Sequence, residues 1–180
     1  MRELYQVWSS SLSAEQVDQI TRMATCQPTE EATVFSSAES MQGIRSCTVR
    51  WLEDDWLQSL LWSYVEEANK SGFQVAVERR AEMQVVDYTA EQNAHYDWHH
   101  DVHWNGQTAL DRKLSITVQL SGSDEYEGGD FEFDEVKTNA DFRSKGTVLV
   151  FPSYLRHRIH PVTSGTRRAL VAWFSGPRWA

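Results

Sequence analysis

The chain has 180 residues, the size of a single domain, and its 17 Lys and Arg against 26 Asp and Glu give a formal net charge of −9. This balance argues against nucleic acid as a partner, because a protein needs a basic surface to neutralise a phosphate backbone. No apolar run reaches the length of a membrane span, and the first residues lack the apolar core of a signal peptide. We expect one domain over residues 1–180 that is cytoplasmic and has no membrane partner.

The cysteine content points to a reducing compartment. Cys26 and Cys47 are the only two cysteines, and they provide neither a disulfide framework nor the spacing of a zinc site. The simplest expectation is two buried thiols, and the sequence leaves open whether they pair.

Two helices are expected in the first part of the chain. The segment Ser13-Ala14-Glu15-Gln16 has the form of a capping box, and the apolar positions after it recur at helical spacing to about Cys26. Residues 27–47 are polar and are expected to form a loop or short irregular strands. A second apolar stripe runs from Trp56 to Val65, with the acidic residue Asp54 near its start.

From about residue 80 the pattern changes to short runs rich in β-branched and aromatic residues, separated by glycines that favour turns. We expect strands at residues 83–88, 113–120, 130–133, 147–151 and 167–174. Helices followed by many strands predict a mainly β fold with supporting helices (α+β), in which a double-sheet β-core carries the helices on one face. The expected boundaries are about 1–80 for the helical support and about 81–176 for the β-core.

A pair of candidate metal ligands lies at the start of the expected core. His99 and Asp101 are two residues apart, so on a strand their side chains would point to the same face and could reach one metal ion. A His-x-Asp pair alone is a weak signal. A third ligand from a distant strand would complete a facial triad of two histidines and one carboxylate, the arrangement found in non-haem Fe(II) oxygenases.

The segment Phe151–Arg167 supplies candidates for the missing groups. His157 follows His99 by 58 residues, and Arg167 lies ten residues further on. An oxygenase that uses 2-oxoglutarate needs such an arginine, because the far carboxylate of the co-substrate pairs well with a planar, permanently charged guanidinium. The order His-x-Asp, His and Arg is therefore a much stronger signal than the first pair alone.

Four ordered segments carry a resemblance to a known family: Tyr96–Asp101, Arg112–Ser121, Tyr126–Phe133 and Phe151–Arg167. With them, the C-terminal two-thirds of the chain resembles the prolyl 4-hydroxylase-like dioxygenases that depend on 2-oxoglutarate and Fe(II), including the bacterial PKHD-type hydroxylases. The resemblance implies a double-stranded β-helix, or jelly roll, with iron near its mouth. The cofactors it implies are Fe(II), 2-oxoglutarate and O2, with ascorbate as a stimulant.

The resemblance also implies roles for individual residues. His99, Asp101 and His157 match the iron ligands of the family, and Arg167 matches the anchor for the distal carboxylate of 2-oxoglutarate. Tyr88 resembles the family tyrosine whose hydroxyl assists co-substrate binding. Two further residues are expected to line the pocket: Trp173, six residues after Arg167, and Gln119, which shares a polar strand face with Thr117 and Ser115.

The sequence leaves alternatives open at two of these positions. His95 and Asp97 also fit the bare His-x-Asp pattern, although Tyr96 stands three residues before the ligand, as the family has it, only in the His99 register. Arg168 could replace Arg167 as the anchor, since successive strand residues face opposite ways and only one can enter the barrel. The remaining histidines, His100, His103 and His160, are expected to lie at the surface or behind the ligands.

The function implied by the resemblance is hydroxylation of an unactivated C–H bond. The first-choice substrate is peptidyl proline, which a procollagen-proline-type prolyl 4-hydroxylase converts to 4-hydroxyproline. The expected partner is then a protein or peptide substrate, gripped by the segments at residues 41–51 and 102–111. A hydroxylase of a small molecule or free amino acid is the main alternative. An AlkB-type nucleic-acid demethylase is disfavoured, because Trp173 stands where that group carries a second arginine. A non-enzymatic β-barrel binding protein gives no reason for the observed order of residues.

Overall fold

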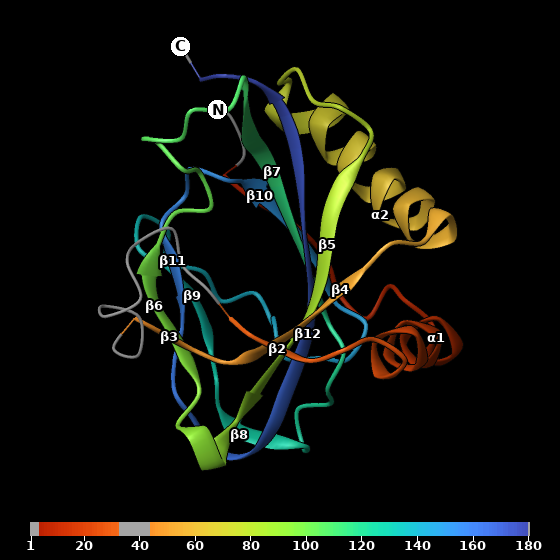
Figure 1. Cartoon of the computed structure of the whole chain (residues 1–180), viewed down its shortest axis with the longest axis vertical. Coiled ribbons are helices and arrows are strands. Elements are labelled where there is room, and N and C mark those ends of the chain that lie inside the picture. Colours follow the sequence, from red (N-terminus) through yellow and green to blue (C-terminus); the bar gives the residue numbers. More distant parts are fainter. Residues whose placement is uncertain (1–3, 33–43, 180) are drawn as a thin grey trace.

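The computed structural model describes residues 4–32 and 44–179. Its two α-helices, α1 (Ala14–Thr25) and α2 (Asp55–Ala68), lie on the same side of a large β-sheet, and a smaller sheet lies on the other side (Figure 1). A short π-helical turn, η2 (Asn69–Phe73), extends α2. None of the helices in these ranges has the length and apolar character needed to cross a membrane.

Both helices begin where the sequence predicts, because a side chain caps each N-terminus. The Ser13 hydroxyl accepts a hydrogen bond from the Gln16 backbone N–H at 3.2 Å, and the Gln16 side chain accepts one from the Ser13 N–H at 2.9 Å. Asp54 accepts a bond from the Leu57 N–H at 2.8 Å. These bonds satisfy backbone donors that have no partner within the helix, which fixes the start of each helix.

The strands form two antiparallel sheets that face each other, so the expected jelly roll is confirmed. The eight-stranded sheet has the order β1 (Gln6–Trp8), β10 (Val148–Pro152), β7 (Leu110–Gln119), β12 (Val162–Pro177), β5 (Ala81–Thr89), β4 (Thr48–Leu52) and β2 (Glu30–Glu31), and β8 (Tyr126–Gly128) pairs with β12. The four-stranded sheet has the order β3 (Arg45–Ser46), β6 (His95–His99), β11 (His157–Ile159) and β9 (Phe131–Phe133).

Each of the five strands expected from the sequence overlaps an observed strand. The short strands β1, β2, β3 and β4 were not expected individually, and they show that the N-terminal part of the chain also contributes to both sheets. Strands of two to five residues carry too little periodicity to be recognised, and they are held by pairing with longer neighbours such as β5 and β10.

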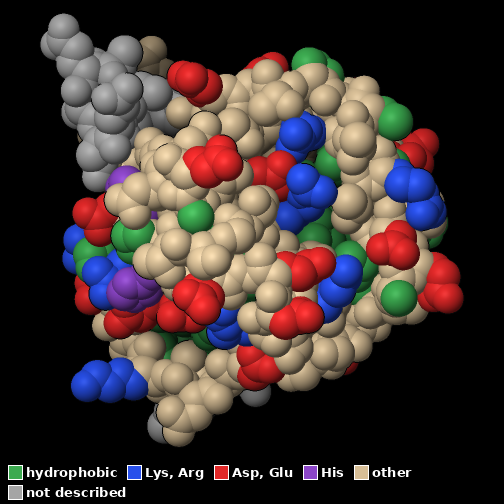
Figure 2. Space-filling model, turned by 90° about the horizontal axis from the view of Figure 1, so that it is seen from below, with side chains coloured by type: hydrophobic (Ala, Val, Ile, Leu, Met, Phe, Trp, Pro, Cys, Tyr) green, Lys and Arg blue, Asp and Glu red, His purple; other side chains and the backbone are tan. Residues whose placement is uncertain are grey.

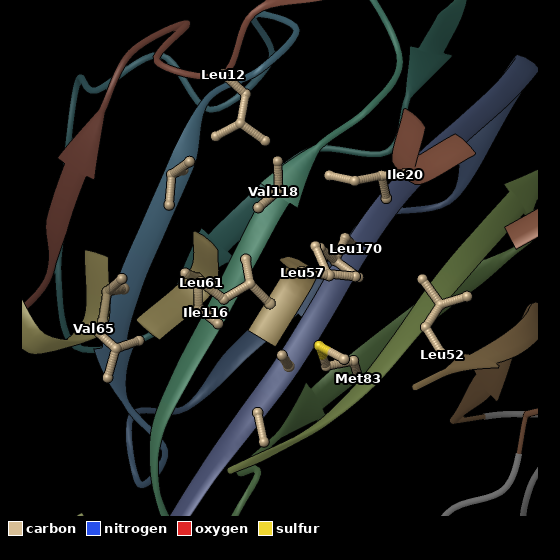
Figure 3. Close-up of a cluster of buried hydrophobic side chains, with 14 of the residues drawn as sticks. Leu12, Ile20, Leu52, Leu57, Leu61, Val65, Met83, Ile116, Val118 and Leu170 are labelled. Carbon is tan, nitrogen blue, oxygen red and sulfur yellow. The ribbon is translucent and has the colours of Figure 1, made fainter. Parts of the chain in front are cut away.

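The main core lies between the helices and the large sheet (Figure 3). Alternate residues of β5, β7 and β12 point toward the helices and are apolar, as expected for strands with two different faces. The sheet contributes Met83, Ile116, Val118 and Leu170, and the helices contribute Ile20, Leu57, Leu61 and Val65, all at most 1% exposed. The other residues of the same strands face the small sheet, and many of these are polar.

An ion cluster ties three strands of the large sheet together. Asp87 of β5 is buried and accepts hydrogen bonds from Arg168 of β12 at 2.6 and 2.9 Å and from Arg50 of β4 at 2.6 Å. Burial alone would raise the pKa of Asp87, but the bonds from Arg168 and Arg50 outweigh it and bring the pKa below its ordinary value. Arg168 is therefore engaged on the face of the sheet opposite to that of its neighbour Arg167.

Charges elsewhere on the surface are mixed. On the face drawn in Figure 2, Asp and Glu side chains lie among the Lys and Arg side chains. Pairs between neighbouring segments include Arg143 with Asp130 at 2.6 Å and Arg158 with Glu132 at 2.7 Å. Exposed ion pairs of this kind contribute about 0–1 kcal/mol each to the free energy of unfolding. They therefore neutralise surface charge but add little stability.

The expectation of two buried thiols is wrong for one of them. Cys47 is buried beside β5, but Cys26 caps the C-terminus of α1 and is exposed. The apolar stripe of α1 ends at Ala24, one turn after Ile20, and Cys26 lies beyond the part of the helix that faces the core. Both cysteines are free, so they do not pair.

Asp87 gives the fold a specific dependence on pH. Because its pKa is depressed in the folded state, the ion cluster stabilises the protein above the ordinary pKa of about 3.9, and this contribution is lost as the pH falls from about 4 toward the folded-state value. We expect Asp87→Asn to lower the free energy of unfolding by about 2–3 kcal/mol at pH 7 in urea denaturation. The difference from the native protein should shrink below pH 4. Asp18→Asn, on the exposed face of α1, is the control; an equal effect of both changes would contradict the assignment.

Candidate active site

The structure brings His99, Asp101 and His157 together at the interface of the two sheets. One potential ligand atom from each residue lies within 4.8 Å of the other two, and no other such group of three occurs among the described residues. His99 ends β6, Asp101 follows it by two residues, and His157 begins β11, where it pairs directly with His99. Asp101 and His157 are each only 5% exposed.

A β-bulge in β6 decides which His-x-Asp pair enters the site. His157 pairs with His99 and Ile159 pairs with Tyr96, so two residues of β6 (97 and 98) oppose one residue of β11 (158). An extra residue of this kind re-aims the side chains that follow it. It places Tyr96 and His99 on the same face, with their rings stacked at 3.4 Å between centroids, and it leaves Asp97 exposed.

Backbone carbonyl groups orient both histidine rings for metal binding. The His99 Nδ1 lies 2.7 Å from the Asp97 carbonyl oxygen, and the His157 Nδ1 lies 2.9 Å from the Leu155 carbonyl oxygen. A carbonyl can only accept, so each Nδ1 carries the proton and each Nε2 keeps its lone pair. The two Nε2 atoms lie 3.6 and 3.7 Å from the oxygens of Asp101, and all three groups therefore face one point.

Two buried serines hold the carboxylate in place. Ser115 of β7 donates a hydrogen bond to the Asp101 Oδ2 at 2.6 Å, and its oxygen lies 2.9 Å from that of Ser153. The Asp101 N–H donates to the Ser153 carbonyl at 3.0 Å. Ser115 was noted in the sequence only as part of a polar strand face. Its contact with Asp101 depends on the distance between the two sheets, which the strand pattern does not contain.

The protonation states suit a divalent cation. Burial, together with the neighbouring His157, lowers the pKa of His99 to about 3, so its ring is neutral. Burial alone would raise the pKa of Asp101, but His157, His99 and the bond from Ser115 bring it below its ordinary value, and the group is a carboxylate. Two imidazoles and one carboxylate on one side of a point match the donor set of a facial-triad iron site.

Arg167 lies in the same pocket as the three residues. The pocket has a volume of about 40 Å³ and is lined among others by Tyr88, His99, Asp101, His157, Arg167 and Trp173; we call it the inner pocket. Arg167 is 4% exposed. Within the described part of the chain, its guanidinium has no carboxylate or hydrogen-bond partner and only stands over the Tyr88 ring, at 5.6 Å.

A buried guanidinium without a carboxylate is costly, so a negatively charged ligand is the expected partner of Arg167. Arg168, the alternative considered from the sequence, is already bonded to Asp87 on the other face of β12. The geometry therefore favours Arg167 as the residue that meets a ligand in the pocket.

The other predicted pocket residues lie nearby. Tyr88 of β5 pairs with Arg167 of β12 across the sheet, and burial raises the pKa of Tyr88, which keeps its hydroxyl protonated. Trp173 lines the pocket on the same face of β12 as Arg167, and its indole N–H has no partner among the described residues. Gln119 does not line the inner pocket; it lines a small cavity that also contacts Arg167.

The remaining histidines stay outside the cluster. The His95 Nδ1 contacts the Asn93 carbonyl oxygen, and His100 contacts that of Tyr154, each through a ring nitrogen. His160 pairs with Glu132 at 2.7 Å, and His103 is exposed. These positions agree with the expectation that the four residues lie at the surface or behind the ligands.

The inner pocket opens through a mouth whose two arginines were not singled out in the sequence. Arg45 of β3 stacks on Tyr96 at 4.6 Å, and Arg112 of β7 stacks on Trp173 at 3.8 Å. With Trp51 they line a space of about 210 Å³, which we call the mouth. Of the two segments expected to grip a substrate, residues 41–43 lie outside the described residues, while Arg45 and Trp51 do reach the mouth. No periodicity marks Arg45, because β3 has only two residues.

Comparison with known proteins agrees with this geometry. The sequence model of the 2OG-Fe(II) oxygenase superfamily matches residues 83–175. A PKHD-type hydroxylase of Synechococcus sp. is 37% identical over 84 residues, which are 46% of this chain and 37% of that protein. A PKHD-type hydroxylase of Gloeothece citriformis is 30% identical over 125 residues, 68% of this chain and 57% of that protein. The chain thus spans less than two thirds of the length of these relatives.

Solved structures show the same fold. A prolyl-4-hydroxylase from Pseudomonas putida superposes with a TM-score of 0.75 at 19% identity, covering 97% of this chain and 93% of the other. A prolyl hydroxylase from Trichoplax adhaerens, solved in complex with a peptide fragment of the hypoxia inducible factor oxygen degradation domain, has a TM-score of 0.73 at 16% identity, with 95% and 83% coverage. The superfamily model covers more than half of the sequence, and this chain belongs to the 2OG-Fe(II) oxygenase superfamily, whose members use Fe(II), 2-oxoglutarate and O2.

Proposed function

We propose that this protein hydroxylates a prolyl residue of a peptide or protein to 4-hydroxyproline. The observation that carries the proposal is a buried His-Asp-His cluster that shares a pocket with a guanidinium for which the described residues offer no partner. The mouth of this pocket adjoins an open groove. Bound Fe(II) and 2-oxoglutarate supply the chemistry, in which dioxygen oxidises an unactivated C–H bond to an alcohol while the co-substrate is converted to succinate and carbon dioxide.

His99 and His157, through their Nε2 atoms, and Asp101, through its carboxylate, would hold the metal. The carbonyl groups of Asp97 and Leu155 fix the two rings, and Ser115 fixes the carboxylate. Ligands held by outer contacts of this kind need little rearrangement when the metal binds. The aromatic rings of Phe131 and Phe151 pack at 5.4 and 4.9 Å from the His157 ring and exclude water from that side.

Arg167 pairs with the distal carboxylate of 2-oxoglutarate in this proposal. The pairing supplies the anionic partner that the buried guanidinium lacks among residues 4–32 and 44–179. The protonated Tyr88 hydroxyl is the expected second contact to the co-substrate, and Trp173 forms the wall between the co-substrate and the mouth. Gln119 does not line the inner pocket in this proposal; it lines the small cavity that also contacts Arg167.

The space outside the pocket favours a peptide over a free amino acid. The mouth shares Trp51 and Trp173 with an open groove of about 1150 Å³, which is lined mainly by residues 52–55, 58–59 and 78–83. Pockets for small ligands have volumes of about 300–1,000 Å³ and enclose most of the ligand. An open groove that runs on from the mouth suits an extended chain with one residue directed inward.

Three aromatic side chains at the entrance suit a proline ring. Tyr96, Trp51 and Trp173 surround the path from the groove to the metal cluster. Such rings offer large apolar surfaces to a compact apolar residue. The PKHD-type relatives and the structural neighbours named as prolyl hydroxylases support the same substrate class.

Loss of one metal ligand should abolish both metal binding and turnover. We expect His157→Ala to lower the affinity for Mn(II), used as a probe for Fe(II), by at least 100-fold in calorimetric titrations, because only two ligands remain. Succinate production should fall to background. His160→Ala is the matched control, since this histidine pairs with Glu132 outside the cluster. Unchanged metal affinity of His157→Ala in a folded protein would rule out the assigned triad.

Substitutions of the two neighbouring arginines, Arg167 and Arg168, should have different effects. Arg167→Leu removes the partner of the distal carboxylate, and we expect the KM for 2-oxoglutarate to rise by at least 100-fold, about 3 kcal/mol for a charge-assisted pair. Arg168→Leu should leave this KM within about threefold and should instead lower the melting temperature, because it breaks the cluster at Asp87. The opposite pattern, with the KM affected by Arg168 alone, would reverse the assignment.

The substrate class can be tested with a peptide library that contains proline in varied contexts. We expect mass spectrometry to detect oxidised proline only when Fe(II) and 2-oxoglutarate are both present, and hydrolysis to release 4-hydroxyproline. Asp101→Ala is the inactive control. Turnover of free amino acids without any peptide product would refute the peptidyl proposal and support the small-molecule alternative, while leaving the metal assignment intact.

A further inference from the structure

Gln119 carries a buried oxygen that no group of the described protein satisfies. The residue ends β7 and is 3% exposed. Its Nε2 donates to the Ser121 carbonyl oxygen and to the Tyr126 hydroxyl, both at 3.1 Å, so both amide protons are used. Its Oε1 is buried without a donor. An unsatisfied buried acceptor costs about 1–3 kcal/mol, which is reason to look for a ligand at this point.

The orientation of the amide is fixed by its neighbours. The Ser121 carbonyl can only accept a hydrogen bond, so the nitrogen end of the Gln119 amide must face it. Rotating the amide by half a turn would bring two acceptors together. The oxygen therefore cannot exchange places with the nitrogen, and it remains the free end of the side chain.

The cavity beside Gln119 is rich in donors. It has a volume of about 10 Å³ and is lined by Gln119, Thr117, Thr147, Arg167 and three apolar residues. The Thr147 hydroxyl accepts a bond from the Ser10 N–H at 3.1 Å and keeps its proton for another acceptor. Arg167 has donors only. Gln119 pairs with Ala169, two residues from Arg167 on the same face of β12, so the amide and the guanidinium are near neighbours.

We propose that this cavity binds one water molecule, which donates one hydrogen bond to the Gln119 Oε1 and the other to the distal carboxylate of 2-oxoglutarate. The inference rests on the proposed role of Arg167 as the anchor of that carboxylate. A volume of about 10–15 Å³ is the minimum that holds a water, and the site offers the two to four polar partners that a buried water needs. Direct contact with the carboxylate is excluded, because two acceptors repel each other.

Gln119 then sets the length of co-substrate that the enzyme accepts. The water fills the space between the carboxylate and the amide, so a diacid that is one methylene longer must displace it. Displacement leaves the Oε1 without a donor and brings a carboxylate against it, and a ligand group that cannot replace the bonds of an ordered water loses affinity. The floor of the pocket is thus a hydrogen-bond acceptor that favours 2-oxoglutarate over 2-oxoadipate.

The test compares the two diacids as ligands of the Mn(II)-loaded full chain, without oxygen, by isothermal titration calorimetry. The native protein should bind 2-oxoglutarate at least tenfold more tightly than 2-oxoadipate. Gln119→Leu keeps a similar volume but has no acceptor, and we expect it to weaken 2-oxoglutarate binding by about tenfold. Binding of 2-oxoadipate should change by less than about threefold, so the preference largely disappears.

Tyr126→Phe is the matched control. It removes the hydroxyl that accepts from the Gln119 Nε2 and leaves the Oε1 in place. Its preference between the diacids should stay within about twofold of the native value. An equal loss of preference in Tyr126→Phe and Gln119→Leu would show that the amide acts only through packing and would overturn the proposal.

A crystal structure of the native protein with Mn(II) and 2-oxoglutarate gives an independent readout that requires no variant. A water within hydrogen-bond distance of both the Gln119 Oε1 and the distal carboxylate supports the inference, and a dry cavity refutes it. Native-like 2-oxoglutarate binding by Arg167→Leu would instead disprove the anchor itself. If Arg167→Leu loses binding while Gln119→Leu keeps the native preference, the anchor stands and only the role of Gln119 fails.

Discussion

The pairing of β6 with β11 is the contact on which the candidate site depends. It sets His99 directly opposite His157, and the bulge between this pair and the next turns Tyr96 inward beside His99. Because strand side chains alternate between two faces, a shift of one residue would send a ligand to the outside. The position of the metal cluster is thus set by backbone hydrogen bonds, and Asp101 joins it through its own bond to Ser153.

The long central strands serve two purposes with their two faces. On β7 and β12, Ile116, Val118 and Leu170 pack against the helices, while Ser115 and Arg167 face the small sheet. A rigid apolar layer on one side allows polar groups on the other side to be held in place, as a precise site requires.

Much of this arrangement could be predicted from the sequence, for identifiable reasons. The helices were predictable because Ser13 and Asp54 are strong capping residues, and the long strands because β-branched residues repeat along them. The ligand candidates followed from residue type and order. The bulge in β6, the contact of Ser115 with Asp101 and the stacking of Arg45 on Tyr96 were not predictable. Each depends on how segments far apart in the chain meet, and a single sequence does not encode that in any local pattern.

The wide sequence separation of the site residues has a consequence for the order of assembly. Arg45 comes from the early part of the chain, whereas His157 and Arg167 come from near its end, and β12 pairs with both β5 and β7. A nascent polypeptide emerging from the ribosome holds two of the three ligands long before the last one appears. A metal ion that needs all three ligands, or a dicarboxylate that needs Arg167, therefore binds tightly only to the completely folded protein. Such binding shifts the folding equilibrium toward completely folded molecules.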